Sequence, residues 1–350
     1  MGLPGNCGIE LYTKWPKGPN NLITDVDGVK VGNVTLQDGE INTGVTAVLP
    51  HGGNLFQDKV MGAVSVINGF GKSVGLVQVE EMGTIETPIV MTNTLSVGTA
   101  TTALVRYMLE QNEDIGVATG TVNCLVTECN DGRLNDIRGL HVTEEMVRRA
   151  IDSAGRDFEE GAVGSGTGMC CLGVKGGIGS ASRLVEVDGK NYVIGSLVMS
   201  NFGSGRNLVL GGKHVGGSLT KLKACKDQGS IIIVIATDIP LNERQLKRVA
   251  KRATIALGRT GSYLGNGSGD IAIAFTTANR IPHYSSRNIL DVKMFYDENI
   301  DPVFEAAVEA VEEAIVSSLY HAKTTRGVRD TVIRSLSEYM EKGLMDGCTI

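Results

Sequence analysis

Ser230 lies at a junction between a glycine and an apolar run. It follows Gly229 and precedes residues 231–236, which read Ile-Ile-Ile-Val-Ile-Ala. If the bond before Ser230 were broken, the serine would gain a free α-amine beside its hydroxyl. Such an amine has a pKa of about 7.7–8.0 and can act as the base for that hydroxyl. The pair therefore predicts an N-terminal nucleophile, although such a dipeptide alone is more typical of a turn before a strand.

A second polar group precedes another apolar run. Residues 266–270 read Asn-Gly-Ser-Gly-Asp and lead into residues 271–275. Ser268 and Asp270 are two positions apart, so on a strand their side chains point the same way. The pair could orient a nucleophile and relay its proton. The alternative is an Asn-Gly hairpin turn with a hydrogen-bonded aspartate.

Two further polar residues follow apolar runs. Asn201 comes after residues 193–199, and an asparagine amide at the end of a strand can donate to an oxyanion. Glu128 lies in an acidic turn after residues 122–126, where its carboxylate could hold a substrate ammonium. A simple turn asparagine and a solvated acidic turn are the respective alternatives.

Glycine-rich residues 164–168 and 176–180 raise the possibility of phosphate binding. A P-loop needs GxxxxGK[ST], which does not occur in the chain. A dinucleotide fold needs GxGxxG at the start of a helix, whereas residues 169–174 have the composition of a strand. Nucleotide binding is therefore not expected.

Composition narrows the partners and the compartment. The net charge of −6 gives no basic footprint for nucleic acid, and no apolar run reaches the roughly 18 residues of a membrane span. Residues 1–15 lack the apolar region of a secretory signal. Seven cysteines without a CxxC pair predict a cytoplasmic protein without disulfides, and five scattered histidines predict no metal site. The chemistry expected of Ser230 requires no organic cofactor.

Strand-like and helix-like segments alternate along the whole chain, with no linker, charge run or repeat. This mixture predicts one α/β domain of stacked layers spanning residues 1–350. Strands are expected at 45–49, 63–67, 74–79, 193–199, 231–236 and 271–275. Helices are expected at 95–109, 143–154, 242–257, 301–319 and 326–340.

Taken together, these motifs resemble the L-aminopeptidase/D-esterase (DmpA-like) family, which includes the β-peptidyl aminopeptidases. The likeness runs from about Asn21 to Leu336. It is carried by ITDVDGV at 23–29, TGVTAVLPHGGN at 43–54, INGFGK at 67–72, TNTLSVG at 92–98, GSGTG at 164–168, SNFG at 200–203 and NGSGD at 266–270.

The resemblance implies a four-layer αββα sandwich of the N-terminal-nucleophile type, shared with the ornithine acetyltransferases. It also implies a precursor that cuts itself between Gly229 and Ser230 into residues 1–229 and 230–350. The cleaved protomers are expected to form a homotetramer. The implied activity is that of a serine aminopeptidase or amidase acting on small peptides, amino-acid amides or esters.

Residue by residue, Ser230 matches the family's catalytic serine, and Ser268 and Asp270 match its supporting serine and acid. Asn201 matches an oxyanion donor, and Glu128 matches the acid that receives the substrate amine. Some relatives carry a tyrosine in their site where this chain has Asn130. Asparagine reaches less far and has no phenol, so substrate preference is expected to differ.

Two other functions fit the same resemblance. One is acyl transfer of the ornithine acetyltransferase type, although those enzymes use threonine where this chain has Ser230. The other is a family member that stays uncleaved and serves as a structural or binding protein.

Overall fold

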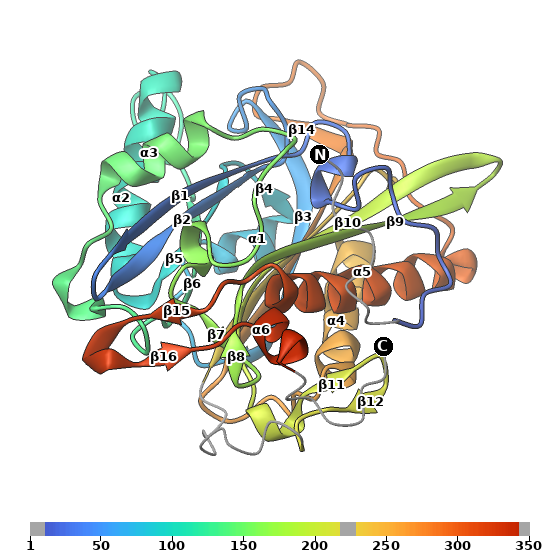
Figure 1. Cartoon of the computed structure of the whole chain (residues 1–350). Coiled ribbons are helices and arrows are strands. Elements are labelled where there is room, and N and C mark those ends of the chain that lie inside the picture. Colours follow the sequence, from blue (N-terminus) through green and yellow to red (C-terminus); the bar gives the residue numbers. More distant parts are fainter. Residues whose placement is uncertain (1–10, 218–228, 343–350) are drawn as a thin grey trace.

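Long apolar strands build two sheets that lie face to face (Figure 1). The structure, a computed structural model, describes residues 11–217 and 229–342. The smaller sheet has the strand order β1-β2-β5-β6, and the larger has the order β4-β3-β14-β13-β10-β9. Short two-stranded pairs, β7 with β8, β11 with β12 and β15 with β16, lie outside them.

The smaller sheet carries helices α2 and α3 on its outer face. Its strands are β1 (Lys30–Asp38), β2 (Ile41–Leu49), β5 (Ile89–Asn93) and β6 (Leu125–Cys129). The helices are α2 (Val97–Gln111) and α3 (Glu144–Asp152). Val45 and Val90 of the sheet pack with Leu104 of α2 and Val147 of α3 in one apolar cluster.

The larger sheet carries helices α4 (Glu243–Arg259) and α5 (Asp301–Tyr320) on its outer face. Asn242 and Gln245 form a capping box that fixes the start of α4, and Pro302 lies in the first turn of α5. The strands are β3 (Asp58–Gly69), β4 (Thr84–Ile85), β9 (Gly177–Val187), β10 (Lys190–Asn201), β13 (Ser230–Thr237) and β14 (Gly269–Pro282).

The inner faces of the two sheets share a third apolar layer. Val48 and Met91 of the smaller sheet pack with Leu197, Ile232 and Ile273 of the larger one. All eight residues of β13 are buried, because this strand is covered by helices on one face and by the other sheet on the opposite face. The layers therefore follow the order α, β, β, α, which confirms the expected sandwich.

Two segments differ from the prediction. Residues 74–79 do not form a strand, because Gly75 adopts a φ of 90° and starts helix α1 (Leu76–Met82). Residues 326–340 do not form one helix, because Arg329 and Asp330 adopt φ values of 55° and 56°. This segment instead contains the end of β15 (Thr325–Arg326), then β16 (Val332–Ile333) and α6 (Leu336–Glu341).

Four short strands lie in the middle third of the chain. They are β7 (Cys170–Cys171) and β8 (Val174–Lys175), within the stretch expected to be strand-like, and the pair β11 (Val209–Leu210) and β12 (Lys213–His214). Across residues 11–217 and 229–342, none of the helices combines the length and apolar character needed to cross a membrane.

A buried carboxyl couples the fold to pH. Glu160 Oε1 accepts hydrogen bonds from the Ser180 N–H and the Ser317 hydroxyl, each at 2.6 Å. Burial raises the pKa of Glu160 from 4.5 to about 7. The folded state thus holds this proton more tightly than the unfolded chain does. Its contribution to stability is present below pH 4.5 and is lost as the pH rises through 7.

We therefore expect the melting temperature of the wild-type protein to fall between pH 5.5 and 8, by on the order of 5 °C from this group. Glu160→Gln keeps the oxygen that accepts both hydrogen bonds and removes the titration, so its melting temperature should fall less over the same range. Thermal unfolding of both proteins at both pH values is the measurement. Parallel pH profiles would contradict the assignment.

Candidate active site

Ser230 is the first residue of β13 and lies directly opposite Asn201, the last residue of β10. Residues opposite each other in an antiparallel pair point to the same face, with Cβ atoms roughly 4.5–5.5 Å apart. Each of the two residues is 6% exposed. The register therefore places the hydroxyl and the amide side by side at one end of the larger sheet.

Gly269 holds the hydroxyl of Ser230 from the other side. It opens β14, the parallel neighbour of β13, and its N–H donates to Ser230 Oγ at 3.1 Å. A Cβ atom at position 269 would lie 2.5 Å from the carbonyl oxygen of Phe70 and 3.1 Å from Ser230 Oγ. Only glycine fits there. Because the backbone donates to Oγ, the hydroxyl proton of Ser230 is not needed for this contact.

Ser268 and Asp270 flank Gly269 on β14 and its approach. The Ser268 hydroxyl donates to Asp270 Oδ1 at 2.7 Å, and both residues are 1% exposed. The two side chains therefore lie on one side of the strand, as their spacing predicts. They form a buried polar pair next to the glycine that contacts Ser230.

The side-chain amide of Asn201 is fixed at both ends. Its Oδ1 accepts from the Cys170 N–H at 2.9 Å, and its Nδ2 donates to the carbonyl oxygen of Asn130 at 3.0 Å. An amide nitrogen carries two hydrogens, so one more N–H can be donated on the Ser230 side.

Asn130 enters the site through its backbone. Its side-chain Oδ1 accepts from the Gly132 N–H at 2.9 Å, which closes a turn. Its carbonyl, as noted, positions Asn201. Asn130 therefore contributes its backbone carbonyl to the site, while its side chain is engaged in the turn.

Glu128 comes from the smaller sheet and is 3% exposed. Its Oε1 accepts from the Lys72 N–H at 2.9 Å, and its Oε2 accepts from the Thr94 hydroxyl. The ammonium of Lys72 lies over the Phe70 ring, 4.6 Å from its centre. Both carboxylate oxygens thus accept from neutral donors, an arrangement that suits pairing with an incoming cation.

The turn after β3 joins the two sheets at this point. The Phe70 N–H donates to the carbonyl of Ser268 at 3.3 Å, and two residues later the Lys72 N–H donates to Glu128. Residues 70–72 therefore connect the backbone of Ser268, in the larger sheet's part of the site, with the carboxylate of Glu128 in the smaller sheet. All five residues that the sequence singled out belong to this one region.

Several residues of the site make contacts that neither composition nor spacing along the chain predicts. They are the backbone donors Gly269, Cys170 and Lys72, the acceptor carbonyl of Asn130 and the hydroxyl of Thr94. Thr94 falls within the TNTLSVG motif and Gly269 within NGSGD, so those motifs contained the residues without indicating their contacts.

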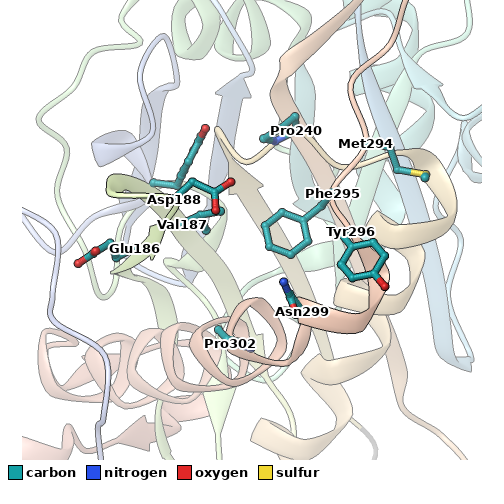
Figure 2. A pocket seen from close by; sticks show the side chains of 10 residues that line it. Glu186, Val187, Asp188, Pro240, Met294, Phe295, Tyr296, Asn299 and Pro302 are labelled. Atoms are coloured by element: carbon teal, nitrogen blue, oxygen red, sulfur yellow. The ribbon is translucent and has the colours of Figure 1, made fainter.

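A groove of about 470 Å³ lies elsewhere on the molecule. Figure 2 shows Phe295, Tyr296 and Pro302 around it, together with Asp188 of the β9–β10 turn. Tyr192, near the start of β10, also lines the groove, whereas Asn201 ends that strand. At about 3.3 Å per residue, the groove and Ser230 are separated by almost the full length of β10.

Known proteins are similar to this chain over nearly its whole length. The β-peptidyl aminopeptidase BapA of Sphingosinicella microcystinivorans is 41% identical over 345 residues, which cover 91% of this chain and 86% of BapA. Among solved structures, the PH0078 protein of Pyrococcus horikoshii OT3 superposes with a TM-score of 0.92 at 53% identity, covering 97% of this chain and 96% of that one.

A third relative defines the class. The L-aminopeptidase D-Ala-esterase/amidase of Ochrobactrum anthropi, described as a prototype of the serine aminopeptidases and a variant of the Ntn hydrolase fold, superposes with a TM-score of 0.87. It is 39% identical, with 97% of this chain and 98% of that one covered. The fold and these relatives define a serine aminopeptidase of the Ntn hydrolase type. Residues 21–333 match the model of peptidase family S58, and the chain belongs to that family.

The Ser268–Asp270 pair yields a direct expectation for turnover. If the pair orients Ser230 as a nucleophile, Ser268→Ala should lower kcat by about 10²-fold with little change in KM, because the pair would then act on the nucleophile and not on substrate binding. Steady-state kinetics on an aminoacyl amide measure this effect.

Ser182→Ala is the matched control. Ser182 is also buried and also donates to an aspartate, Asp25, at 2.6 Å. Its loss should lower the melting temperature and leave kcat within about twofold. Equal kinetic losses in the two variants would show that the Ser268 pair serves the fold alone.

Proposed function

We propose that the chain cuts itself between Gly229 and Ser230 and then uses Ser230 to release N-terminal residues from small peptides, amino-acid amides or esters. The observation that carries this proposal is the position of Ser230 at the start of β13, with Oγ held by the Gly269 N–H and Asn201 directly opposite. The serine aminopeptidase and β-aminopeptidase activities named for the relatives support the substrate class.

Self-cleavage begins with attack of Ser230 Oγ on the carbonyl carbon of Gly229. The peptide C–N bond breaks, the serine nitrogen takes a proton and leaves as an amine, and an ester joins Gly229 to Oγ. Water then hydrolyses the ester. A Cβ atom at Gly229 would lie 1.7 Å from the carbonyl oxygen of Asn201, so only glycine allows this residue to sit against the end of β10.

Turnover repeats the chemistry on a substrate. The α-amine of Ser230 takes the hydroxyl proton while Oγ attacks the substrate carbonyl. The remaining Nδ2–H of Asn201 stabilises the oxyanion, Ser268 and Asp270 orient the nucleophile, and Glu128 binds the substrate ammonium. The leaving amine or alcohol receives the proton, and water hydrolyses the acyl-enzyme.

The proposal extends to the domain organisation, cleavage, oligomeric state and location of the protein. The chain forms one αββα domain, matures into residues 1–229 and 230–350, and assembles as a homotetramer of cleaved protomers in the cytoplasm, with small substrates as its partners. Support comes from the family and from a composition without a basic footprint. Closed symmetry is usual for homo-oligomers.

Cleavage is visible in the mass of the purified protein. The 37.0 kDa wild-type chain should give two pieces of about 24 and 13 kDa, in proportion to their lengths, because Ser230 attacks the bond before it. Ser230→Ala should stay whole, and Ser182→Ala should be cut like the wild type. A wild-type protein that is active but uncut would refute the mechanism.

Recognition of the substrate amine is tested by Glu128→Gln, which keeps the shape of the side chain and removes its charge. We expect kcat/KM for an aminoacyl amide to fall by about 10²-fold, because the substrate ammonium loses its ionic partner. The same amide with an acetylated amine should be affected little. Self-cleavage should persist, since that step binds no free amine. Equal losses on both substrates would contradict amine recognition by Glu128.

A further inference from the structure

Lys175 is a buried cation near the site. It ends the short strand β8, and its residue surface is fully buried. Its ammonium donates to the carbonyl oxygens of Gly166, Met169 and Gly176 at 3.0, 2.8 and 2.7 Å. These three bonds use every N–H of the ammonium. A buried charge is costly unless it is fully hydrogen-bonded, so the position requires a reason beyond packing.

The carbonyl of Met169 links Lys175 to Asn201. Met169 O and Cys170 N belong to one peptide group, whose C=O and N–H point in opposite directions when the bond is trans; the described residues contain no cis peptide bond. On one side this group accepts from Lys175 Nζ. On the other, its N–H donates to Asn201 Oδ1 at 2.9 Å. The ammonium of Lys175, the Met169–Cys170 peptide group and the side-chain amide of Asn201 are therefore linked by consecutive hydrogen bonds.

The hydrogen bonds from Lys175 to Asn201 all run in the same direction. Every group accepts from the side of the cation and donates away from it, and hydrogen bonds in such a chain polarise one another. A positive charge at one end makes the last donor, Asn201 Nδ2–H, more acidic. That donor lies on the face that Asn201 shares with Ser230. A more acidic N–H is a better partner for a negative oxygen than for a neutral one.

We propose that Lys175 is a positioning residue that holds and polarises the oxyanion donor Asn201 through the Met169–Cys170 peptide group. The inference rests on the proposed function of Ser230 and Asn201. It assigns to a buried lysine, which touches no reacting atom, a contribution that appears when negative charge develops on the substrate oxygen.

The charge state of the lysine is consistent with this role. Burial lowers the pKa of Lys175 to about 8, while Cys170, Cys171 and Asp131 act to raise it. The ammonium form therefore predominates at neutral pH. Burial also raises the pKa of Asp131 to about 6, below neutrality, so a nearby anion is retained to balance the cation.

The test is a double-mutant cycle of Lys175→Met and Asn201→Ala, measured as kcat and KM per cleaved protein on an aminoacyl amide. With Asn201 present, Lys175→Met should lower kcat about 10-fold and leave KM within about twofold. In the Asn201→Ala background, the same change should alter kcat less than about twofold, because the group through which Lys175 acts is gone. Equal losses in both backgrounds would overturn the proposal.

Lys59→Met is the matched control for removal of a part-buried cation. Lys59 lies at the opposite end of β3 from the site and pairs with Glu86 and with the Phe56 carbonyl. It should lower the melting temperature without the loss of kcat. If Lys59→Met lowers kcat as much as Lys175→Met, the effect is general destabilisation and the proposal fails.

Hydrogen exchange separates this idea from the function on which it rests. A wild-type protein with no hydrolytic activity would refute the proposed function. In that case Lys175→Met must still speed amide exchange in peptides covering residues 166–176, relative to wild type and to Lys59→Met. Unchanged exchange in this segment would overturn the positioning role whether or not the protein is active.

Discussion

Close approach of backbones at the start of β13 is the constraint on which the site depends. Gly229 lies against the end of β10 and Gly269 against the turn after β3, each so near a carbonyl oxygen that no side chain fits. This approach brings the Gly269 N–H to the hydroxyl of Ser230 and sets Asn201 opposite it. A methyl group at either glycine would separate strands whose ends carry the chemistry.

The layers around the site make that approach rigid. β13 is buried along its whole length, with helix-covered residues on one face and the other sheet on the opposite face. Groups held on strands of a packed sandwich are positioned more accurately than groups on loops. The smaller sheet contributes a carboxylate to the site. Glu128 on β6 accepts hydrogen bonds from neutral donors, an arrangement that suits pairing with a cation. Each sheet thus supplies a different part of one site: the larger one holds Ser230, the proposed nucleophile, and the smaller one holds Glu128, the proposed partner of the substrate ammonium.

The sequence was a good guide to the fold and to the side chains that meet. Apolar runs, the Asn242 cap and the Asp301-Pro302 start located strands and helices that the structure confirms, because these signals are local. The predictions of a strand at 74–79 and of one helix at 326–340 were wrong. Gly75 and Arg329 adopt left-handed backbone conformations that override the apolar pattern. The backbone contacts of the site could not be predicted from the sequence, for a different reason. The N–H groups of Gly269 and Cys170 meet their partners only through strand register and layer stacking, which spacing along the chain does not encode.

The central claim is that Ser230 is a nucleophile carrying its own amine, and one measurement tests it most directly. Purified wild-type protein is treated with an acylating substrate analogue that leaves a slowly hydrolysed ester, and the adduct is located by tandem mass spectrometry. The account predicts a single adduct on the side-chain oxygen of Ser230, in a fragment whose first residue is Ser230 with an unmodified α-amine. An adduct on any other residue, or on a Ser230 still joined to Gly229, would contradict it.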